Sequence, residues 1–438
     1  MFFARRSTEH PRLGRALPRA AAALLLLAVP SSCGEDPAAA DPNLPDAAPS
    51  EPQPDAGPAT DGASVDAPAD AARLEVTCAV SPCARDLSAS WGESFCALLD
   101  DGRVACWGRN ASGELGRDAG PWSATPAPVE GLTNAIALDR TCAVVAGGGI
   151  VCWGPAQTPA SEGEALPAAR SVRVGGGFAC AVLTDGKVAC WGKNGADGVL
   201  AYAGAGSGED VPPTVVPLDG TVDEIAIARR TTVEPPPIFC PTCPPTVTDI
   251  HAVIARRADG QVSSWGLVPL IGRPTEQKPD PKPGRIAVDR ATRVFGGYGG
   301  CVAAGTELGC WGYGRDDVGG DLRPLPVPLV PHALQVALGD YGDGRFGRGC
   351  AVTPTGGVSC WGENDYGQAG DGTLAFRELP VKVANLPEPI VRVEATAGTT
   401  CALGVSGRIH CWGDDAFGQR GRKTPFTKDP APLPVELP

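Results

Sequence analysis

Cysteine is the residue type in this chain whose number and spacing could do chemistry. The 438-residue sequence contains 17 cysteines, and twelve of them form six pairs nine or ten residues apart. Paired thiols can hold a metal ion, cycle between redox states or form structural disulfides, so the surrounding residues must decide among these roles. The six pairs are Cys96 with Cys106, Cys142 with Cys152, Cys180 with Cys190, Cys301 with Cys310, Cys350 with Cys360, and Cys401 with Cys411.

The spacing indicates that the two cysteines of each pair face each other across a β-hairpin. In five pairs a glycine stands six positions after the first cysteine, as Gly102 does after Cys96. A three-residue loop that ends in a left-handed glycine places residues ten apart directly opposite each other. Cys301 and Cys310 are nine apart, and there Gly305-Thr306 fits a two-residue turn. Opposed strand residues are close enough to bond, so we predict six disulfides within hairpins.

A seventh hairpin lacks both cysteines. Ile254 and Ser264 stand at the paired positions, so both partners are missing together, as expected if they bond to each other. Each hairpin ends in Trp-Gly, and we expect the tryptophans to be packing residues and not part of a cofactor site. They are Trp107, Trp153, Trp191, Trp265, Trp311, Trp361 and Trp412.

Seven copies of one hairpin unit predict a closed ring of blades, because a single hairpin cannot bury its apolar face. The high content of Gly (58) and Pro (45) also favours turns and short strands over helices. We therefore predict an all-β, seven-bladed propeller over residues 73–438. The C-terminal "PAPLPVELP" resembles a strand, and we expect it to complete the N-terminal blade and so close the ring.

Four further cysteines leave alternatives open. Cys78 and Cys83 precede the first hairpin, and Cys240 and Cys243 lie in an insertion of the fourth. They could form two local disulfides, or the first two cysteines could pair with the last two. All four could also bind one zinc ion, or Cys240 and Cys243 could be redox-active. Local disulfides are favoured because blades one and four lie far apart in a seven-membered ring.

The N-terminus has the features of an export signal. Five arginines precede the apolar run 20–29, which is too short to span a bilayer, and Pro30-Ser31-Ser32-Cys33 follows. The segment 1–33 resembles a bacterial lipoprotein signal, which implies that Cys33 is lipidated and becomes the mature N-terminus. Ordinary secretion is the alternative. Either route leads to an oxidising compartment at or beyond the cell envelope, where disulfides persist.

Residues 34–72 form a compositionally distinct segment. It holds nine acidic residues and no Lys or Arg, with Pro and Ala filling most of the rest. Such a segment cannot bury enough apolar surface to fold, so we expect a disordered, extended stalk. The chain carries a net charge of −13 and no basic patch, which makes nucleic acid an unexpected partner.

The residues after each Trp-Gly carry a family resemblance. "CWGENDYGQAGDGT" (360–373), "CWGRNASGELG" (106–116) and "CWGDDAFGQRG" (411–421) resemble the regulator of chromosome condensation repeat. That family forms seven-bladed propellers, and the Cys-Trp-Gly version resembles its exported bacterial members. The family includes a guanine-nucleotide exchange factor and an exported inhibitor of β-lactamases. The export signal argues against exchange activity on cytosolic GTPases.

Catalytic and metal-binding patterns are scarce. Beyond the signal the sequence has only His251, His332 and His410, without a hydrolase, nucleotide-binding or calcium-loop motif. We expect no cofactor and no metal. The favoured hypothesis is a non-catalytic, surface-tethered propeller that binds an extracellular or envelope protein, or a glycan. The alternatives are an inhibitor of a secreted enzyme and an enzyme with its site in the central channel.

Three long, less repetitive loops are the candidate binding elements, because loops on a rigid scaffold usually carry recognition residues. They are residues 195–220 with Tyr202, residues 231–249 with Phe239 and residues 313–332 with Tyr313.

Overall fold

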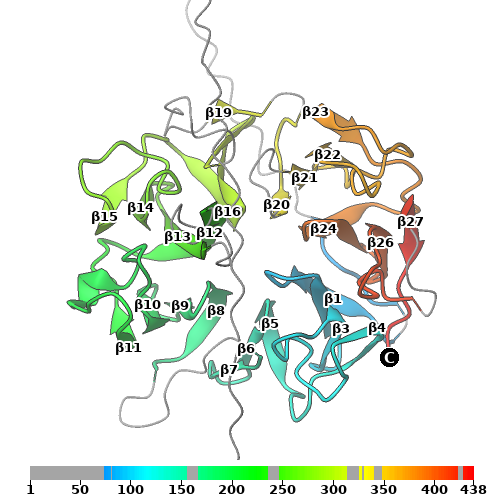
Figure 1. The fold of residues 1–438 in the computed structure, drawn as a ribbon, viewed down its shortest axis with the longest axis horizontal. Coiled ribbons are helices and arrows are strands. Elements are labelled where there is room, and N and C mark those ends of the chain that lie inside the picture. Colours follow the sequence, from blue (N-terminus) through cyan, green and yellow to red (C-terminus); the bar gives the residue numbers. More distant parts are fainter. Residues whose placement is uncertain are drawn as a thin grey trace, which may run out of the picture. The chain divides into compact units, whose positions relative to one another are not determined.

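The computed structural model describes residues 74–79, 81–154, 166–234, 246–312, 325–327, 330–339, 348–422 and 428–438. These residues form strands β1 to β27 and one 3-10 turn, η1 (Ala201–Ala203). The strands group into seven antiparallel blades arranged around a central axis (Figure 1). The molecule is therefore an all-β, seven-bladed propeller, as the repeats predict.

The first three blades run in chain order from the channel outward. Blade 1 contains β1 (Ala84–Ala89), β2 (Ser94–Leu99), β3 (Val104–Arg109) and β4 (Trp122–Pro128). Blade 2 contains β5 (Ala135–Asp139), β6 (Cys142–Val145) and β7 (Ile150–Cys152). Blade 3 contains β8 (Ala169–Val174), β9 (Phe178–Leu183), β10 (Val188–Lys193) and β11 (Asp210–Val215).

The remaining four blades repeat this order. Blade 4 contains β12 (Val222–Glu234), β13 (Thr246–Arg257), β14 (Val262–Gly266) and β15 (Asp280–Arg285). Blade 5 contains β16 (Ala291–Gly297), β17 (Gly299–Ala304), β18 (Glu307–Trp311) and β19 (Leu325–Pro326). Blade 6 contains β20 (Gln335–Gly339), β21 (Arg348–Val352), β22 (Val358–Gly362) and β23 (Arg377–Lys382). Blade 7 contains β24 (Ile390–Ala395), β25 (Thr399–Gly404), β26 (Ile409–Gly413) and β27 (Asp429–Pro434).

The hairpin glycines set the register of the central strands. Gly102 has a φ of +81°, and the equivalent glycines have φ between +77° and +84°, which residues with a Cβ rarely adopt. All seven pairs of positions lie directly opposite each other, including Ile254 and Ser264 in blade 4. The turns therefore keep the paired side chains face to face in every blade.

The six predicted hairpin disulfides are present, with Cα atoms 4.0 to 4.1 Å apart. Each one links the second strand of its blade to the third. The bridges join Cys96 to Cys106, Cys142 to Cys152, Cys180 to Cys190, Cys301 to Cys310, Cys350 to Cys360, and Cys401 to Cys411.

The prediction that the C-terminal strand completes the first blade was wrong. β27 pairs with β26 of its own blade, and blade 1 already has β4 as its outer strand. The segment after Trp-Gly turns back onto the hairpin it has just left, so the outer strands of the described chain are supplied locally. Val435, just beyond β27, does reach the neighbouring blade, where it packs in the same apolar cluster as Leu87 and Trp107.

The repeat tryptophans join each blade to the one before it. The indole Nε1 of Trp107 donates a hydrogen bond to the backbone oxygen of Gln419, which spans the junction between blades 1 and 7 (2.9 Å). The same bond recurs at four other junctions, from Trp153 to Glu114, Trp265 to Val199, Trp311 to Leu270 and Trp412 to Gln368. The ring is thus closed by side-chain packing and indole hydrogen bonds.

The tail that follows Trp-Gly is organised by its own polar side chains. Asn110 Oδ1 accepts the backbone N–H of Leu115, and Asn364 and Asp415 make the same five-residue bridge in blades 6 and 7. These bonds hold the loop whose carbonyl receives the next tryptophan. The glycine of Trp-Gly is also required, since a Cβ on Gly108 would lie 2.4 Å from the Glu93 oxygen.

The two ends of the ring differ in character. At one end of the ring, the first strand of each blade connects to the second and the third connects to the fourth; we name this end the loop face. We name the opposite end, where the second strand connects to the third, the turn face. Hydrogen bonds such as Lys193 N–H to Gly177 O (2.8 Å) bring these two kinds of connection together on the loop face. The described chain begins and ends on the turn face, where Thr77 bonds Val405 and Val435 bonds Ile409.

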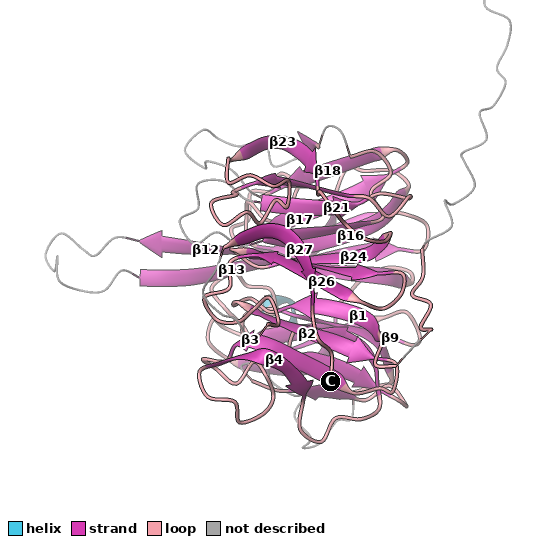
Figure 2. Cartoon of the chain, turned by 90° about the vertical axis from the view of Figure 1, so that its right-hand side faces the viewer, coloured by secondary structure: helices cyan, strands magenta, loops and turns pink. Residues whose placement is uncertain are grey.

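Blade 4 departs most from its neighbours. β12 and β13 pair over their whole length, but β14 pairs only with residues 252–256 of β13. The two strands therefore extend as a ribbon from the loop face (Figure 2). The loop predicted at 231–249 is in part this ribbon.

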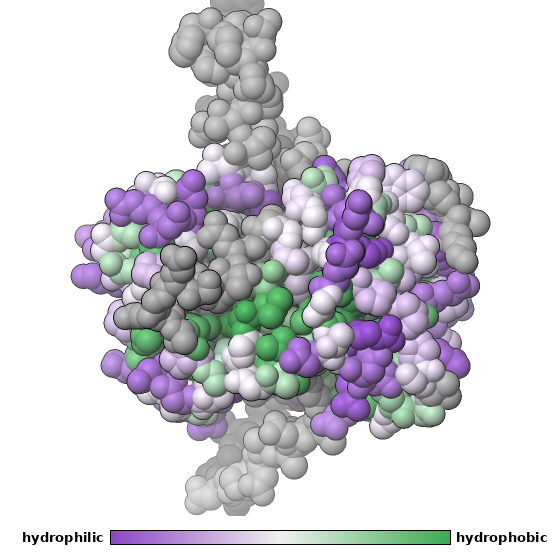
Figure 3. Space-filling model, turned by 90° about the horizontal axis from the view of Figure 1, so that it is seen from below, coloured by the Kyte–Doolittle hydropathy of each residue, from purple (hydrophilic) through white to green (hydrophobic). Residues whose placement is uncertain are grey.

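Blade 2 exposes two large apolar side chains. Ile136 is 58% exposed and Val151 of β7 is 40% exposed. Apolar side chains gather at the centre of the view onto this side of the ring (Figure 3). Elsewhere the apolar side chains are mostly buried between blades, in clusters that draw on two adjacent sheets.

Candidate binding site at the channel mouth

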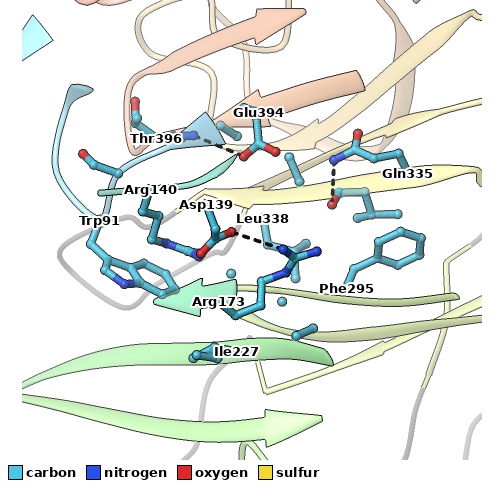
Figure 4. Close-up of a pocket in the computed structure, with 18 of the residues that line it drawn as sticks. Trp91, Asp139, Arg140, Arg173, Ile227, Phe295, Gln335, Leu338, Glu394 and Thr396 are labelled. Carbon is cyan, nitrogen blue, oxygen red and sulfur yellow. Dashed lines mark hydrogen bonds and ion pairs between the residues drawn. The ribbon is translucent and has the colours of Figure 1, made fainter. Parts of the chain in front are cut away.

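The first strand of each blade lines the central channel, and several of these strands bear charged side chains. Asp139, Glu224 and Glu394 come from blades 2, 4 and 7, and Arg173 and Arg293 from blades 3 and 5. Figure 4 shows Asp139 lying between Arg140 and Arg173, at 2.8 and 3.9 Å. Charged groups of both signs therefore converge here from most of the ring.

These channel acceptors hold neighbouring blades together. Asp139 Oδ2 accepts the backbone N–H of Val174 in the next blade (2.8 Å). Glu224 accepts Val294 N–H, Gln335 accepts Val393 N–H and Glu394 accepts Ala89 N–H in the same way. Each side chain crosses one blade junction, so the channel carboxylates contribute to the closure of the ring.

Burial raises the pKa of the Glu394 carboxyl above its ordinary value, although Arg392 and Arg140 oppose the shift. The Arg392 guanidinium bonds Glu394 at 2.9 Å and also pairs with Asp86 at 2.9 Å. A similar balance holds at Arg348, where burial lowers the pKa to about 10 while the charge of Glu93 opposes it. Ion pairs in this region are therefore partly shielded from water.

A cavity of about 280 Å³ occupies the channel beneath the loop face. Its lining includes the channel charges and the connection between β1 and β2, residues 90–93. This connection contains Trp91-Gly92, an eighth Trp-Gly that ends no hairpin. The repeat pattern does not predict a role for this Trp-Gly. Its position ahead of the first hairpin, outside the repeat register, was the available signal.

Trp91 reaches across the channel mouth to three other blades. Its Nε1 donates to the backbone oxygen of Val174 in blade 3 (3.1 Å). The guanidinium carbon of Arg140 lies 3.7 Å from the Trp91 ring centre, and that of Arg229, on β12, lies 5.0 Å away. Cation–π contacts of this kind hold both arginines around the indole.

A second cavity of about 350 Å³ lies beside the first on the loop face. The two share five lining residues, namely Ser90, Trp91, Gly92, Arg109 and Arg140. Arg229 and Asp249 at the base of the ribbon also line the second cavity, where Arg229 Nη2 donates to both carboxylate oxygens of Asp249 at 2.8 and 2.9 Å. The channel mouth is therefore a concave site lined by one Trp and several Arg side chains, bordered by the ribbon.

The remaining predicted site residues lie as follows. Cys78 and Cys83 form a local disulfide, so they are not ligands of a shared zinc site. Cys33, Phe239, Cys240, Cys243 and Tyr313 lie outside the described residues. Six repeat tryptophans are buried and Trp153 is partly exposed. Tyr202 is partly buried against the core of blades 3 and 4, and its hydroxyl donates to Thr214 O (3.1 Å).

His251 and His410 are buried within the ring, whereas His332 is partly exposed. His251 donates from Nδ1 to buried Asp197 (2.7 Å), and its Nε2 accepts the N–H of Gly176 (3.1 Å), an arrangement of a neutral imidazole. His410 is buried on β26, near Glu388. Within the described ranges there is no cluster of three or more potential metal ligands. In that same part of the chain, no helix is long and apolar enough to cross a membrane.

Comparison with protein families agrees with this geometry. Residues 355–403 match the regulator of chromosome condensation (RCC1) repeat, and residues 85–114, 169–197 and 390–419 match a second profile of that repeat. These segments are similar to RCC1 repeats. Each spans parts of a first strand, a Cys hairpin or the tail after Trp-Gly.

Curated relatives share only part of their length with this chain. The mouse E3 ubiquitin-protein ligase HERC2 is 28% identical over 184 residues, which is 38% of this chain and 4% of that protein. The probable human E3 ubiquitin-protein ligase HERC4 is 34% identical over 90 residues, which is 20% of this chain and 8% of that protein. The chain therefore spans less than a tenth of the length of either relative.

Solved structures share the fold. Human WBSCR16 aligns with a TM-score of 0.55 and 18% identity, covering 75% of this chain and 88% of its own. Prp20p from Saccharomyces cerevisiae aligns with a TM-score of 0.50 and 16% identity, covering 80% and 76%.

Proposed function

We propose that this chain is a non-catalytic, surface-tethered binding propeller of the bacterial cell envelope, which captures a partner protein on its loop face. The observation that carries the proposal is the concave Trp91 and Arg140 site at the centre of that face, bordered by the projecting β12–β13 ribbon. Trp and Arg are the residues that most often dominate binding energy at protein interfaces. The yeast propeller Prp20p has binding properties toward Gsp1p and histones, which supports a similar use of the ring.

Two features support export and tethering. Seven disulfides among the described residues, six of them within hairpins, suit an oxidising compartment. The described chain begins on the turn face, near Val405. A lipid anchor at Cys33 followed by the acidic stalk 34–72 would therefore connect to the ring through the segment that enters at the turn face.

Binding is favoured over catalysis because the channel carboxylates are already engaged. Asp139, Glu224 and Glu394 each accept a backbone N–H and also contact an arginine. A general acid or base needs a free lone pair or proton at the reacting atom. The enzyme alternative predicts a turnover that is abolished by Glu394→Gln in the folded ring.

The test is capture of a partner from the envelope fraction of the producing cells by the full exported chain. A ribbon variant replaces residues 231–249 with Asn-Gly, a two-residue turn that joins the paired residues Arg230 and Ile250. A control variant carries Asp185→Asn and Lys187→Gln in an exposed ion pair on the turn face.

We expect the native chain and the turn-face control to retain the same partner, and the ribbon variant to lose it while it keeps a native circular dichroism spectrum. Equal capture by all three proteins contradicts a binding role for the loop face. A captured enzyme that is inhibited at a one-to-one ratio would narrow the function to enzyme inhibition.

A further inference from the structure

Arg140 combines several unusual features at one position. Its φ is +51°, a left-handed conformation that costs energy for a residue with a Cβ. Its Nε is buried and has no hydrogen-bond partner within the described residues. The described chain has four non-glycine residues with such a φ, and Arg140 is the one that lines both cavities of the channel mouth. A strained residue with an unused donor beside a cavity indicates a functional side chain.

The position of Arg140 is fixed from three sides. Its backbone N–H donates to Ser88 Oγ of blade 1 (2.8 Å), and its Nη1 donates to Asp139 (2.8 Å). The Trp91 ring packs against the guanidinium. Since a guanidinium has five N–H groups, the remaining donors of Arg140 are held in place without being consumed by these contacts.

Arg109 supplies a second cation at the same place. It ends β3, is exposed, lines both cavities and lies over the Phe417 ring at 5.2 Å. No carboxylate of the described residues lies within ion-pair distance of it. The carboxylates of the second cavity are occupied elsewhere, because Asp249 pairs with Arg229 and Glu114 accepts the N–H of Ser112.

We propose that Arg109 and Arg140 form a subsite for a carboxylate on an acidic segment of the partner protein, with Trp91 as the platform that holds Arg140. This inference rests on the proposed function and names its partner chemistry. Guanidinium groups bind carboxylates through two parallel N–H···O bonds, which a planar, preorganised arginine favours. A protein segment fits better than a glycan because the cavity wall continues into the ribbon, so an extended chain can contact it beyond the charged centre.

The test is calorimetric titration of the full exported chain at low ionic strength with the hexapeptide acetyl-EDEDED-amide. The comparison ligands are its amide analogue acetyl-QNQNQN-amide, inorganic phosphate and hexagalacturonate. The variants are Arg109→Ala, Arg140→Ala and Arg140→Lys. Arg103→Ala is the matched control, an arginine of the same blade that pairs with Asp101 on the turn face.

We expect the acidic peptide to bind and the amide analogue not to bind. Each alanine variant should weaken the peptide by about tenfold, as for the loss of one charge-assisted contact, and Arg103→Ala should leave it unchanged. Arg140→Lys should recover only part of the affinity, because an ammonium lacks the planar fork. The exposed Arg109 variant keeps the test valid if Arg140→Ala fails to fold.

Peptide binding that is insensitive to Arg109, or equal for the acid and amide peptides, overturns the subsite. Stronger binding of hexagalacturonate, or equal binding of phosphate, overturns the assignment to a protein segment. These failures are separate from failure of the proposed function. Partner capture that depends on the ribbon can survive the loss of the subsite. Capture by the ribbon variant, in contrast, contradicts the proposed binding role of the loop face.

Discussion

At the scale of single residues, the repeat tryptophan has two roles that its burial alone does not reveal. Its indole fills the space between blades, and its Nε1 satisfies a carbonyl in the tail of the preceding blade. Trp107 is fully buried and bonds Gln419, whereas Trp153 makes the equivalent bond to Glu114 while partly exposed. Comparison of these two tryptophans therefore separates the contribution of the hydrogen bond to stability from the contribution of burial.

We expect Trp107→Phe to lower the free energy of unfolding by about 2 to 3 kcal/mol, since it leaves a cavity and an unsatisfied Gln419 carbonyl. Trp153→Phe removes the same kind of bond and should cost less, because the Trp153 side chain is already partly exposed and loses less buried area. Denaturant titration of both variants checks the order. Equal losses would show that burial at the junction of blades 1 and 7 contributes little.

His410 gives a prediction for pH dependence. Burial lowers the pKa of its imidazole below the usual 6.5, although nearby Glu388 opposes the shift and Arg408 and Arg422 reinforce it. The folded protein therefore binds a proton less readily than the unfolded chain. Stability then rises with pH between the lowered pKa and about 6.5, and is lost as the pH falls through that range.

Thermal midpoints measured at pH 7 and pH 5 test this linkage. The native protein should lose more stability on acidification than His410→Gln does. His332→Asn is the control, since His332 has a φ of +55° that asparagine tolerates. A native-like pH response in His410→Gln would assign the acid sensitivity to other groups.

At the scale of elements, sequence spacing predicts the contacts within one hairpin but not the hydrogen bonds between blades. The opposed cysteines and the turn glycines follow from a ten-residue interval, because a hairpin is determined by its own chain. Asp139, Glu224 and Glu394 occupy dissimilar local sequences, and the N–H that each one accepts belongs to another blade. No pattern within one repeat identifies them. The strand pairing of "PAPLPVELP" was mispredicted for the same reason.

Blade 4 shows that a hairpin of this fold can form without its disulfide, since Ile254 and Ser264 oppose each other where cysteines stand elsewhere. Transfer of this pair to blade 3, as Cys180→Ile with Cys190→Ser, should keep the propeller folded. The loss of one ten-residue cross-link should cost about 2 to 3 kcal/mol in chain-entropy terms.

Urea titration measures that cost. The single variant Cys190→Ser is the control, and we expect it to be less stable than the double variant because it leaves a buried thiol without its partner. Failure of the double variant to fold would mean that blade 3 depends on its disulfide in a way that blade 4 does not.

At the scale of the whole molecule, each blade consists of strands that follow one another along the chain, and within the described ranges no strand is exchanged at the closure. The two ends of the described chain both lie on the turn face, against the hairpin of β25 and β26. A circular permutant that joins Pro438 to Leu74 by a flexible linker and opens between Asp219 and Gly220, before β12, should therefore fold. Its thermal midpoint should lie within a few degrees of that of the native ring.

Circular dichroism and a cooperative melt check the permutant. A second permutant opened inside a hairpin, between Asp185 and Gly186, should fail to fold. It places β9 and β10 at opposite ends of the chain, so Cys180 and Cys190 are no longer close in sequence. Equal behaviour of the two would show that the blade is not the unit of assembly.

The local pairing of cysteines also bears on how the chain is made. Every disulfide in the described residues joins a cysteine to the next one along the chain, with partners five to ten positions apart. As the polypeptide emerges vectorially, each cysteine meets its correct partner before any wrong one has appeared. An oxidant that acts on cysteines in order of synthesis makes these bridges correctly the first time, and a disulfide isomerase has nothing among them to repair.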